Sequence, residues 1–295
     1  MRTLVIIVTY NFMPWLDRCL GSLRRLEKPV DVMVIDNGSA DDTVKAIRKG
    51  YKEVTLIENH ANLGFGRANN IGIRYAMEKG YDAVFLLNED AWVDPDVIRR
   101  LEETAEKHPD YGILSPVHLT GSGEKVEHGF GVYVGVTDKD RLPKEEIVEV
   151  PFIDAALWLV PLKAIKKTGM FAPLFYHYGE DKDLCNRMAY HHLKVGYVPT
   201  VFGYHDREHR EQTRQRVFHA ERVYMLSEFA NPCYSLPMAF AKSVLASLKK
   251  ALTALCHGRL TDCGSHFRVI GFLFVRTGGV IRTRRESQRG GVREE

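Results

Sequence analysis

Three short apolar runs early in the chain are each followed at once by polar side chains. They cover residues 3–8, 30–35 and 83–87. Runs of this length that are largely apolar are typical of strands buried on both faces of a sheet. Residues 14–26 show the apolar spacing of a helix between the first two runs. Strands that alternate with helices predict βαβ units, so we expect an α/β fold with a mainly parallel sheet flanked by helices.

The third apolar run ends in Asn88, Glu89 and Asp90. In open α/β sheets, ligands bind beyond the carboxyl ends of the strands. A pair of carboxylates at such an end suits a divalent cation and, through the cation, a phosphate group. The alternative is a solvated acidic turn that leads into a helix near residues 94–95.

Weaker signals follow the other strands. Tyr10 could stack on a flat base, while Asp36 or Asn37 could hydrogen-bond a base or a ribose. Gly64 and Gly66 would let a phosphate approach the backbone closely. Each signal also has a structural explanation, as a core aromatic residue or an ordinary turn. The chain has no G-x-G-x-x-G after a strand and no Walker lysine loop, which disfavours a dinucleotide site or a P-loop.

The composition is that of a globular protein. With 295 residues, of which 45% are hydrophobic and 27% charged, the chain can bury a large core. The five cysteines form no C-x-x-C pair, which argues against a disulfide framework and a cysteine zinc site. This pattern favours a reducing compartment, so we expect a cytoplasmic protein. No apolar run is long enough to cross a membrane or to form the core of a signal peptide.

The charge is distributed unevenly. The net charge is +3, but residues 237–295 carry +7 and the preceding residues carry −4. Apolar residues recur at helical spacing over residues 241–255, beside several lysines. A basic amphipathic helix can bind an anionic membrane surface; the alternative is a helix packed on the rest of the chain or on a second copy in a homodimer. Nucleic acid is disfavoured, because the basic segment lacks interleaved aromatic residues and the rest of the chain is acidic.

The order and spacing of the motifs resemble those of the inverting family 2 glycosyltransferases, closest to their rhamnosyltransferase-like branch. The resemblance covers about residues 3–210 and implies the glycosyltransferase-A fold, with a nucleotide-binding sheet. It rests on the combination of motifs, because no single motif is specific. The matching segments are IVTYN (7–11), VIDNGSADDT (34–43), NLGFGRANN (62–70), FLLNED (85–90), GMF (169–171) and FYHYGEDKDLCNR (175–187).

The resemblance implies a role for each candidate residue. Asp90 and His205 would hold Mg²⁺ or Mn²⁺, and Asp181 would be the general base. Trp158 and Glu180 would contact the acceptor. The nucleotide sugar would be bound by Thr9, Tyr10, Asn11, Asp36, Asn37, Gly64, Arg67, Asn88 and Glu89.

Elementary chemistry gives these roles a physical basis. The cation neutralises charge on the departing diphosphate, and the base takes a proton from the attacking hydroxyl group. Structural alternatives remain, because acidic residues such as Asp181 are common at helix starts, His205 could be a surface histidine and Trp158 a core aromatic residue. Asn37 and Asn88 stand where many family members have Asp, so the metal loses one carboxylate and the nucleobase stays unassigned.

We therefore expect a catalytic domain over residues 1–236, with about residues 1–115 binding the nucleotide sugar and about 150–210 on the acceptor side. Residues 237–295 would form a basic helical extension with a disordered tail. We assign no chemical role to the irregular segment 122–149.

The expected function is an inverting, metal-dependent transfer of a rhamnose-like deoxyhexose or another hexose. The sugar would move from a nucleotide diphosphate sugar to a hydroxyl group of a glycan or lipid-linked acceptor in cell-surface polysaccharide synthesis. The enzyme would work in the cytoplasm, peripherally on the inner face of the cell membrane. Two alternatives are a non-catalytic nucleotide-binding scaffold that docks at a membrane or partner, and a sugar-phosphate nucleotidyltransferase. The nucleotidyltransferase would need a glycine-rich basic loop where this chain has residues 9–12.

Overall fold

The computed structural model describes residues 1–207 and 213–290. Within this part of the chain, nine strands form one sheet in the order β3-β2-β1-β4-β8-β6-β9-β5, and β7 pairs with β9. The strands are β1 (Thr3–Thr9), β2 (Asp31–Asp36), β3 (Thr55–Glu58), β4 (Ala83–Asn88), β5 (Ala91–Val93), β6 (Tyr111–Leu119), β7 (Val148–Glu149), β8 (Leu157–Pro161) and β9 (Lys194–His205).

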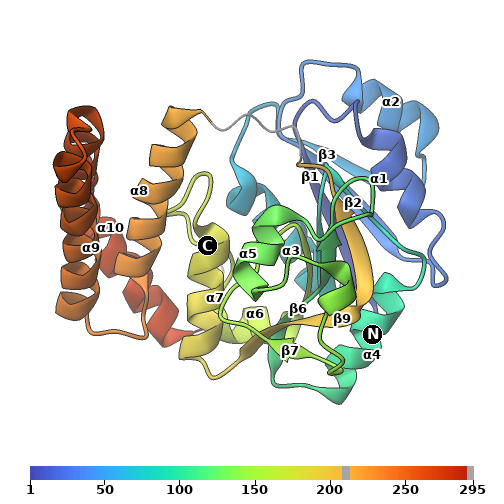
Figure 1. The fold of residues 1–295 in the computed structure, drawn as a ribbon. Helices are drawn as coiled ribbons and strands as arrows, with labels where there is room; N and C mark the ends of the chain where they lie inside the picture. The colour runs from blue at the N-terminus through green and yellow to red at the C-terminus, as the bar shows by residue number, and fades with distance from the viewer. Residues whose placement is uncertain (208–212, 291–295) are drawn as a thin grey trace.

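The first half of the sheet is parallel, as predicted. β1 lies between β2 and β4, and β3 pairs with β2, all in one direction. β8 then pairs antiparallel with β4, whereas β6 and β9 run parallel to each other. The sheet is therefore mixed across its full width. The predicted fold class, an α/β protein with a central sheet flanked by helices and a C-terminal helical region, is confirmed (Figure 1).

Helices cover both faces of the sheet and bury two apolar clusters. Residues of α3, α6 and α7 pack on one face, and residues of α1, α2 and α4 pack on the other. Burial on both faces explains why β1 and β4 are apolar without alternation. The helices are α1 (Leu16–Leu23), α2 (Thr43–Gly50), α3 (Phe65–Glu78), α4 (Val97–Lys107), α5 (His128–Val134), α6 (Leu162–Thr168), α7 (Glu180–Tyr190), α8 (Arg214–Ala230), α9 (Leu236–Cys256) and α10 (Leu260–Arg289).

The segment 122–149 contains short regular elements rather than a wholly irregular loop. It holds α5, a 3₁₀ turn over Lys139–Arg141 and β7. Phe130 of α5 is fully buried and packs against the rings of His118 and Tyr197. This contact attaches α5 to the strands β6 and β9.

Helices α8, α9 and α10 form a separate layer beside α7 (Figure 1). We expected the basic end of the chain to be disordered, but α10 continues to Arg289. The reason is Arg284, which is 5% exposed and donates hydrogen bonds to the carbonyl groups of Phe229, Asn231 and Tyr234. These carbonyls at the end of α8 anchor the last turns of α10. Residues 291–295 of the expected tail lie outside the described residues.

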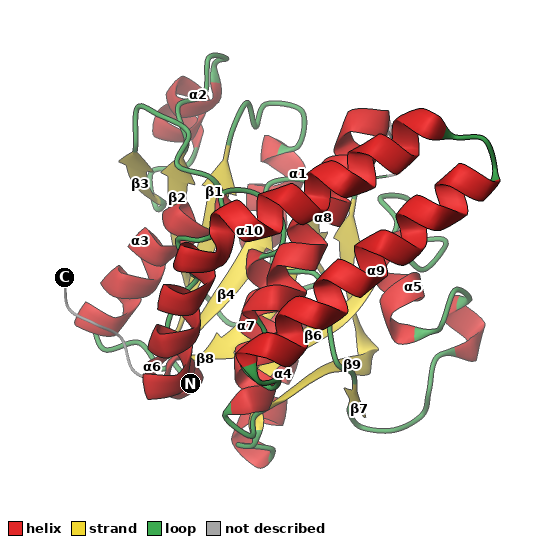
Figure 2. Ribbon diagram, turned by 90° about the vertical axis from the view of Figure 1, so that its left-hand side faces the viewer, coloured by secondary structure: helices red, strands yellow, loops and turns green. Residues whose placement is uncertain are grey.

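Helices α9 and α10 form a hairpin on the outside of the molecule, as Figure 2 shows. Small side chains line the buried side of α9, whereas Leu245 and Leu252 are exposed. Phe267 and Phe274 of α10 are also exposed. None of the helices in the described residues is long and apolar enough to cross a membrane.

Candidate active site

The pairing of β5 with β9 brings Asp90 and His205 together. Ala91 lies opposite His205 in this antiparallel pair, and the backbone nitrogen of Asp206 donates to the carbonyl of Asp90 at 2.8 Å. The two side chains then meet, with Nε2 of His205 3.2 Å from Oδ1 of Asp90. His205 is the last residue of β9.

The Asp90 and His205 pair fits a divalent cation. His205 is fully buried, and neither of its ring nitrogens has a hydrogen-bond partner among the described residues. A buried nitrogen in this state calls for a partner, and beside a carboxylate a cation can serve both groups. Neighbouring ligands of an octahedral ion with bonds of 2.0–2.1 Å lie about 3 Å apart, which is close to the observed separation. The two residues could therefore hold Mg²⁺ or Mn²⁺.

At the end of β2, Asp36 and Asn37 hold the backbone of the neighbouring turns. Oδ2 of Asp36 accepts hydrogen bonds from the backbone nitrogens of Gly38 and Ser39, at 3.0 and 3.1 Å. The amide oxygen of Asn37 accepts from the side chain of Asn59 at 2.9 Å. Asp36 and Asn37 are each 3% exposed, so these contacts already occupy much of their polar surface. Their contact with a base or ribose stays a prediction.

The predicted residues at the ends of β1 and β4 lie side by side. Thr9 is buried, with its hydroxyl 3.4 Å from Oδ1 of Asp36, whereas Tyr10 is 48% exposed. Oε2 of Glu89 accepts a hydrogen bond from the backbone nitrogen of Tyr10 at 2.7 Å. This bond ties the two strand ends together and leaves the ring of Tyr10 at the surface.

Two further predicted residues flank this edge. Asn11 has a positive φ of 63°, and its side-chain oxygen accepts from the backbone nitrogen of Ala40 at 2.9 Å. Asn88 is half-buried, and its backbone nitrogen donates to the carbonyl of Ala156. Their proposed contacts with the nucleotide sugar also remain predictions.

The glycine-rich segment before α3 packs against the loop that precedes α7. Gly64 has a φ of +80°, and a Cβ atom there would lie 2.1 Å from the carbonyl oxygen of Tyr176. Only glycine fits this contact, so packing already requires it, whether or not a phosphate binds nearby. Arg67, in the first turn of α3, is exposed. The side chain of Asn70 bonds both backbone groups of Phe171 and completes the connection.

Glu180 and Asp181 begin α7, directly after Gly179. Burial raises the pKa of Glu180, and the neighbouring Asp181 raises it further. Burial likewise raises the pKa of Asp181. Farther along the helix, Asp183 and Arg187 form a buried ion pair at 2.9 Å, and Arg187 also donates to a carbonyl at the end of α6. This pair fixes the helix that carries Asp181, the candidate base, and Glu180, the candidate acceptor contact.

Arg207 connects the metal pair with the candidate base. Its Nη1 donates to Oδ2 of Asp154 at 3.1 Å, and its positive charge acts on Asp90 as well. The same charge lowers the pKa of Asp181, whereas Asp154 raises it. The structure therefore gathers Asp90, His205 and Asp181 into one site around Arg207.

The sequence analysis gave no role to Arg207, Asp154 or His118, although all three lie in this site. His118 is fully buried on β6, and burial lowers its pKa to about 3, so the ring is neutral. One available signal was the position of Arg207 only two residues after His205, directly beyond the end of β9. His118 and Asp154 lie far away in sequence and had no comparable signal.

The aromatic residue near the candidate base Asp181 is Tyr133, not the predicted Trp158. Trp158 is opposite Leu86 within the sheet and is 0% exposed, so the expected contact with an acceptor sugar is wrong and Trp158 is a core residue. Tyr133 of α5 is 43% exposed and packs edge-on against Phe152, with ring centroids 4.7 Å apart. Burial and the carboxylates of Asp154 and Asp181 raise the pKa of Tyr133 to about 12.

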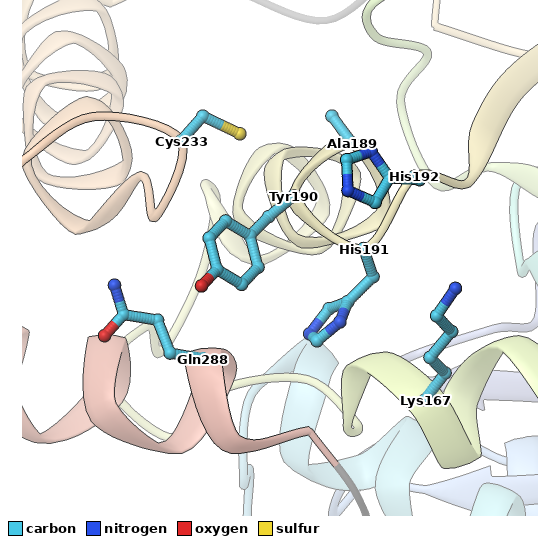
Figure 3. Close-up of a pocket in the computed structure, with 7 residues that line it drawn as sticks. All are labelled: Lys167, Ala189, Tyr190, His191, His192, Cys233 and Gln288. Atoms are coloured by element: carbon cyan, nitrogen blue, oxygen red, sulfur yellow. The ribbon is translucent and has the colours of Figure 1, made fainter.

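A cavity of about 510 Å³ lies at the other end of α7, away from Asp181. Figure 3 shows residues from α6, from the end of α7 and from α10 around it, together with Cys233 from the α8–α9 connection. Nε2 of His191 lies 2.8 Å from the carbonyl of Ser287 and joins α7 to α10 here. The cavity is thus a junction of helices and does not include the site residues described above.

The family model described as Glycosyl transferase family 2 matches residues 4–167 of this chain. This match covers more than half of the chain and includes Asp90. It ends before Asp181 and His205. An N-acetylglucosaminyl-diphospho-decaprenol L-rhamnosyltransferase from Mycobacterium tuberculosis is 29% identical in an alignment of 252 positions that covers 75% of this chain and 82% of that protein.

Two solved structures share the fold. The mannosyltransferase PcManGT from Pyrobaculum calidifontis, in complex with GDP-Man and Mn²⁺, has a TM-score of 0.59 and 19% identity over 93% of this chain and 86% of its own. GalNAc-T7 with UDP, GalNAc and Mn²⁺ has a TM-score of 0.58 and 17% identity over 76% of this chain. This chain spans 47% of the GalNAc-T7 chain. Similarity at these identities shows the fold alone.

We expect Glu180→Gln to stabilise the protein at neutral pH, by about 1–3 kcal/mol. Because burial raises the pKa of Glu180, the folded state binds this proton more tightly than the unfolded state. Stability is therefore greatest below the ordinary glutamate pKa of about 4.3 and falls as the pH rises through the raised folded-state value. Thermal unfolding measured across this pH range should show a smaller loss of stability in Glu180→Gln than in the wild type. The exposed Glu145→Gln is the control, and equal pH dependence of Glu180→Gln and wild type would contradict the prediction.

Proposed function

The chain belongs to glycosyl transferase family 2, and on that premise we propose an inverting, metal-dependent enzyme that moves a sugar from a nucleotide diphosphate sugar to a hydroxyl group. The sugar would be a rhamnose-like deoxyhexose or another hexose, and the acceptor a glycan or lipid-linked molecule of cell-surface polysaccharide synthesis. The observation that carries the proposal is the convergence of the Asp90 and His205 pair with Asp181 around Arg207.

Asp90 and His205 would hold the divalent cation. When bound, the ion would stabilise negative charge on the departing diphosphate. Mn²⁺ and Mg²⁺ both accept oxygen and imidazole ligands, and two structures with the same fold contain Mn²⁺. Arg207 would add a second, fixed positive charge on the same side.

Asp181 would act as the general base. In an inverting displacement, a carboxylate takes the proton of the acceptor hydroxyl as the oxygen attacks the anomeric carbon. A base is most effective when its pKa approaches the working pH, and burial moves the pKa of Asp181 in that direction. The charge of Arg207 opposes this rise and favours the ionised form of Asp181 that a general base requires.

The residues predicted to bind the donor suit a nucleotide sugar but do not select one nucleobase. Asn37 can donate and accept hydrogen bonds, so it could serve more than one nucleobase. The two structures with this fold contain GDP-Man and UDP, respectively. A rhamnose-like donor is supported by the relative from Mycobacterium tuberculosis, which is a rhamnosyltransferase.

The acceptor would lie against α5. Tyr133 and Phe152 offer an aromatic corner next to Asp181, and Nζ of Lys182 lies 5.2 Å from the ring centre of Phe152. Aromatic rings pack well against the apolar faces of sugars. The name of the Mycobacterium tuberculosis relative gives it a diphospho-decaprenol substrate, which supports a lipid-linked acceptor here.

The exposed side of the α9–α10 hairpin would bind an anionic membrane surface. Leu245 and Leu252 are 63% and 59% exposed, and Phe267 and Phe274 extend the apolar area on α10. The exposed Lys249 lies beside the two leucines, which matches the charge of anionic lipid. A lipid-linked acceptor would bring the enzyme to such a surface.

The alternatives weighed from the sequence have lost support. A non-catalytic scaffold disagrees with membership of a glycosyltransferase family. A nucleotidyltransferase would need a basic glycine-rich loop after β1, where Tyr10 and Asn11 instead bond to the ends of β4 and β2.

Asp90→Asn should abolish metal-dependent nucleotide binding. We expect calorimetry to find that one of UDP, dTDP and GDP binds the wild type more tightly with Mn²⁺, and that the variant loses about tenfold or more in affinity, or about 1.4 kcal/mol. The control is Asp42→Asn, an exposed carboxylate near the end of β2 that pairs only weakly with Lys45. Equal losses in both variants, or no binding of any nucleotide to the wild type, would count against the proposed metal site.

Asp181→Asn should lower kcat by about 10²–10⁴-fold while leaving donor binding intact, because general-base catalysis contributes that much. The assay uses the donor identified by calorimetry and a polyprenyl-diphospho-N-acetylglucosamine acceptor. Because the pKa of Asp181 is raised, wild-type activity should fall with decreasing pH from above the ordinary aspartate value of about 3.9. Lys167→Ala, at the remote cavity, is the activity control. Unchanged kcat in Asp181→Asn would exclude it as the base.

The double substitution Leu245→Asp and Leu252→Asp should weaken binding to phosphatidylglycerol vesicles by at least about tenfold. Each leucine would move from water into the membrane surface on binding, and full burial of a leucine side chain contributes about 1.5–3 kcal/mol. Co-sedimentation with anionic and neutral vesicles measures this. Val217→Asp, an exposed apolar position on α8, is the matched control. If light scattering shows a wild-type dimer that the double variant dissociates, and vesicles do not bind, the hairpin is a dimer interface instead.

A further inference from the structure

Three buried side chains beside Asp90 carry polar atoms with no hydrogen-bond partner among the described residues. They are His118 on β6, Asp154 before β8 and His205 at the end of β9. One ligand atom from each lies within 4.8 Å of the others. A buried polar atom without a partner costs about 1–3 kcal/mol, so such a cluster calls for a group that satisfies it.

The two contacts of the Ser115 hydroxyl favour one tautomer of His118, the one with its proton on Nε2. The Ser115 hydroxyl has one hydrogen, which it donates to the carbonyl of Pro116 at 2.9 Å. Oγ of Ser115 therefore accepts a hydrogen bond from Nε2 of His118, which is also 2.9 Å away. In a neutral imidazole the other nitrogen, Nδ1, then presents its lone pair.

That lone pair faces a second acceptor. Nδ1 of His118 lies 3.5 Å from Oδ1 of Asp154, and an ionised carboxylate has no hydrogen to donate. Two such atoms repel each other unless a positive group lies between them. Two ligands of a tetrahedral ion with bonds of 2.0–2.2 Å are about 3.4 Å apart, so the spacing suits a shared cation.

We propose that His118, Asp154 and His205 form a buried site for a transition-metal ion of the Zn²⁺ type, which shares only His205 with the Asp90 pair. Two imidazole nitrogens and one carboxylate oxygen are a donor set that Zn²⁺ favours, with one position left for water. The site stands on its own donors and does not depend on the proposed sugar transfer.

The surrounding residues hold these donors in place. Arg207 donates to Oδ2 of Asp154 at 3.1 Å and leaves Oδ1 available. The buried ring of Phe130 packs on His118, with centroids 4.6 Å apart. Outer contacts of this kind orient the ligands of a metal site before the ion binds.

The buried site and the Asp90 pair share His205. Nε2 of His205 lies 3.2 Å from Oδ1 of Asp90. Because a neutral imidazole has one lone pair, His205 can ligate an ion at only one of the two sites at a time. Zn²⁺ in the buried site therefore competes with the ion that Asp90 would hold.

The test is binding of Zn²⁺ and Co²⁺ to the metal-free, full-length protein without nucleotide, by calorimetry and by the visible absorption of bound Co²⁺. We expect saturable binding with the spectrum of four-coordinate Co²⁺. His118→Gln and Asp154→Asn should each weaken it by about tenfold to a hundredfold or more. Asp90→Asn, which removes the carboxylate of the competing pair, should still bind Co²⁺ with the four-coordinate spectrum.

Several results would overturn the proposal. One is the absence of saturable binding to the wild type. Another is binding that persists in both His118→Gln and Asp154→Asn, or that falls only in Asp90→Asn, which would assign the ion to the Asp90 pair. Loss of binding in Cys233→Ser or Cys256→Ser would assign it to the exposed thiols. Thermal unfolding of each variant checks the fold, and His118→Asn replaces the glutamine variant if that one does not fold.

Discussion

The site depends on one short antiparallel contact, between β5 and β9. The chain turns at Asp90 directly after β4, and β5 then pairs with the far end of β9. This pairing carries His205 across the sheet to within 3.2 Å of the Asp90 carboxylate. It also carries Arg207, which reaches Asp154. A shift of β9 by one residue would turn His205 to the other face of the sheet, because side chains alternate along a strand.

The family motifs serve the architecture as much as the chemistry. Gly64 is required by the backbone of Tyr176, and Asn70 bonds the backbone of Phe171, so the donor segment before α3 is joined to the acceptor segment before α7. Asp183 in turn fixes α7 through its ion pair with Arg187. Each of these motif residues therefore positions a neighbouring segment of the chain. Loss of any of them would misplace Asp181 even though none of them need touch the substrate.

Local pattern was enough to predict β1, β2 and β4 and the carboxylates at the end of β4, because apolar runs buried on both faces have no competing interpretation. His205 and Asp181 came from the family resemblance. The sequence could not predict the contacts of Asp154 with His118 and Arg207, because those partners meet only through the order of strands in the sheet. Trp158 was predicted to contact the acceptor sugar, but it lies in the core. A tryptophan in the sequence does not by itself show whether its ring packs in the core or against a sugar. The sequence likewise could not predict that α10 is a regular helix to its end, because this depends on long-range contacts of Arg284.

The electrostatics of the site explain why it should bind cations. Glu180, Asp181 and Asp154 are gathered with Asp90 in a buried region, and Arg207 acts on Asp90, Asp154 and Asp181. Burial of this negative charge raises the pKa of Glu180 and Asp181, which means that ionisation of these groups opposes folding at neutral pH. A cation that binds only the folded state reverses part of that cost and stabilises the fold by mass action. The apolar strands β1 and β4 thus hold in place an edge rich in acidic groups, to which we expect a cation to bind.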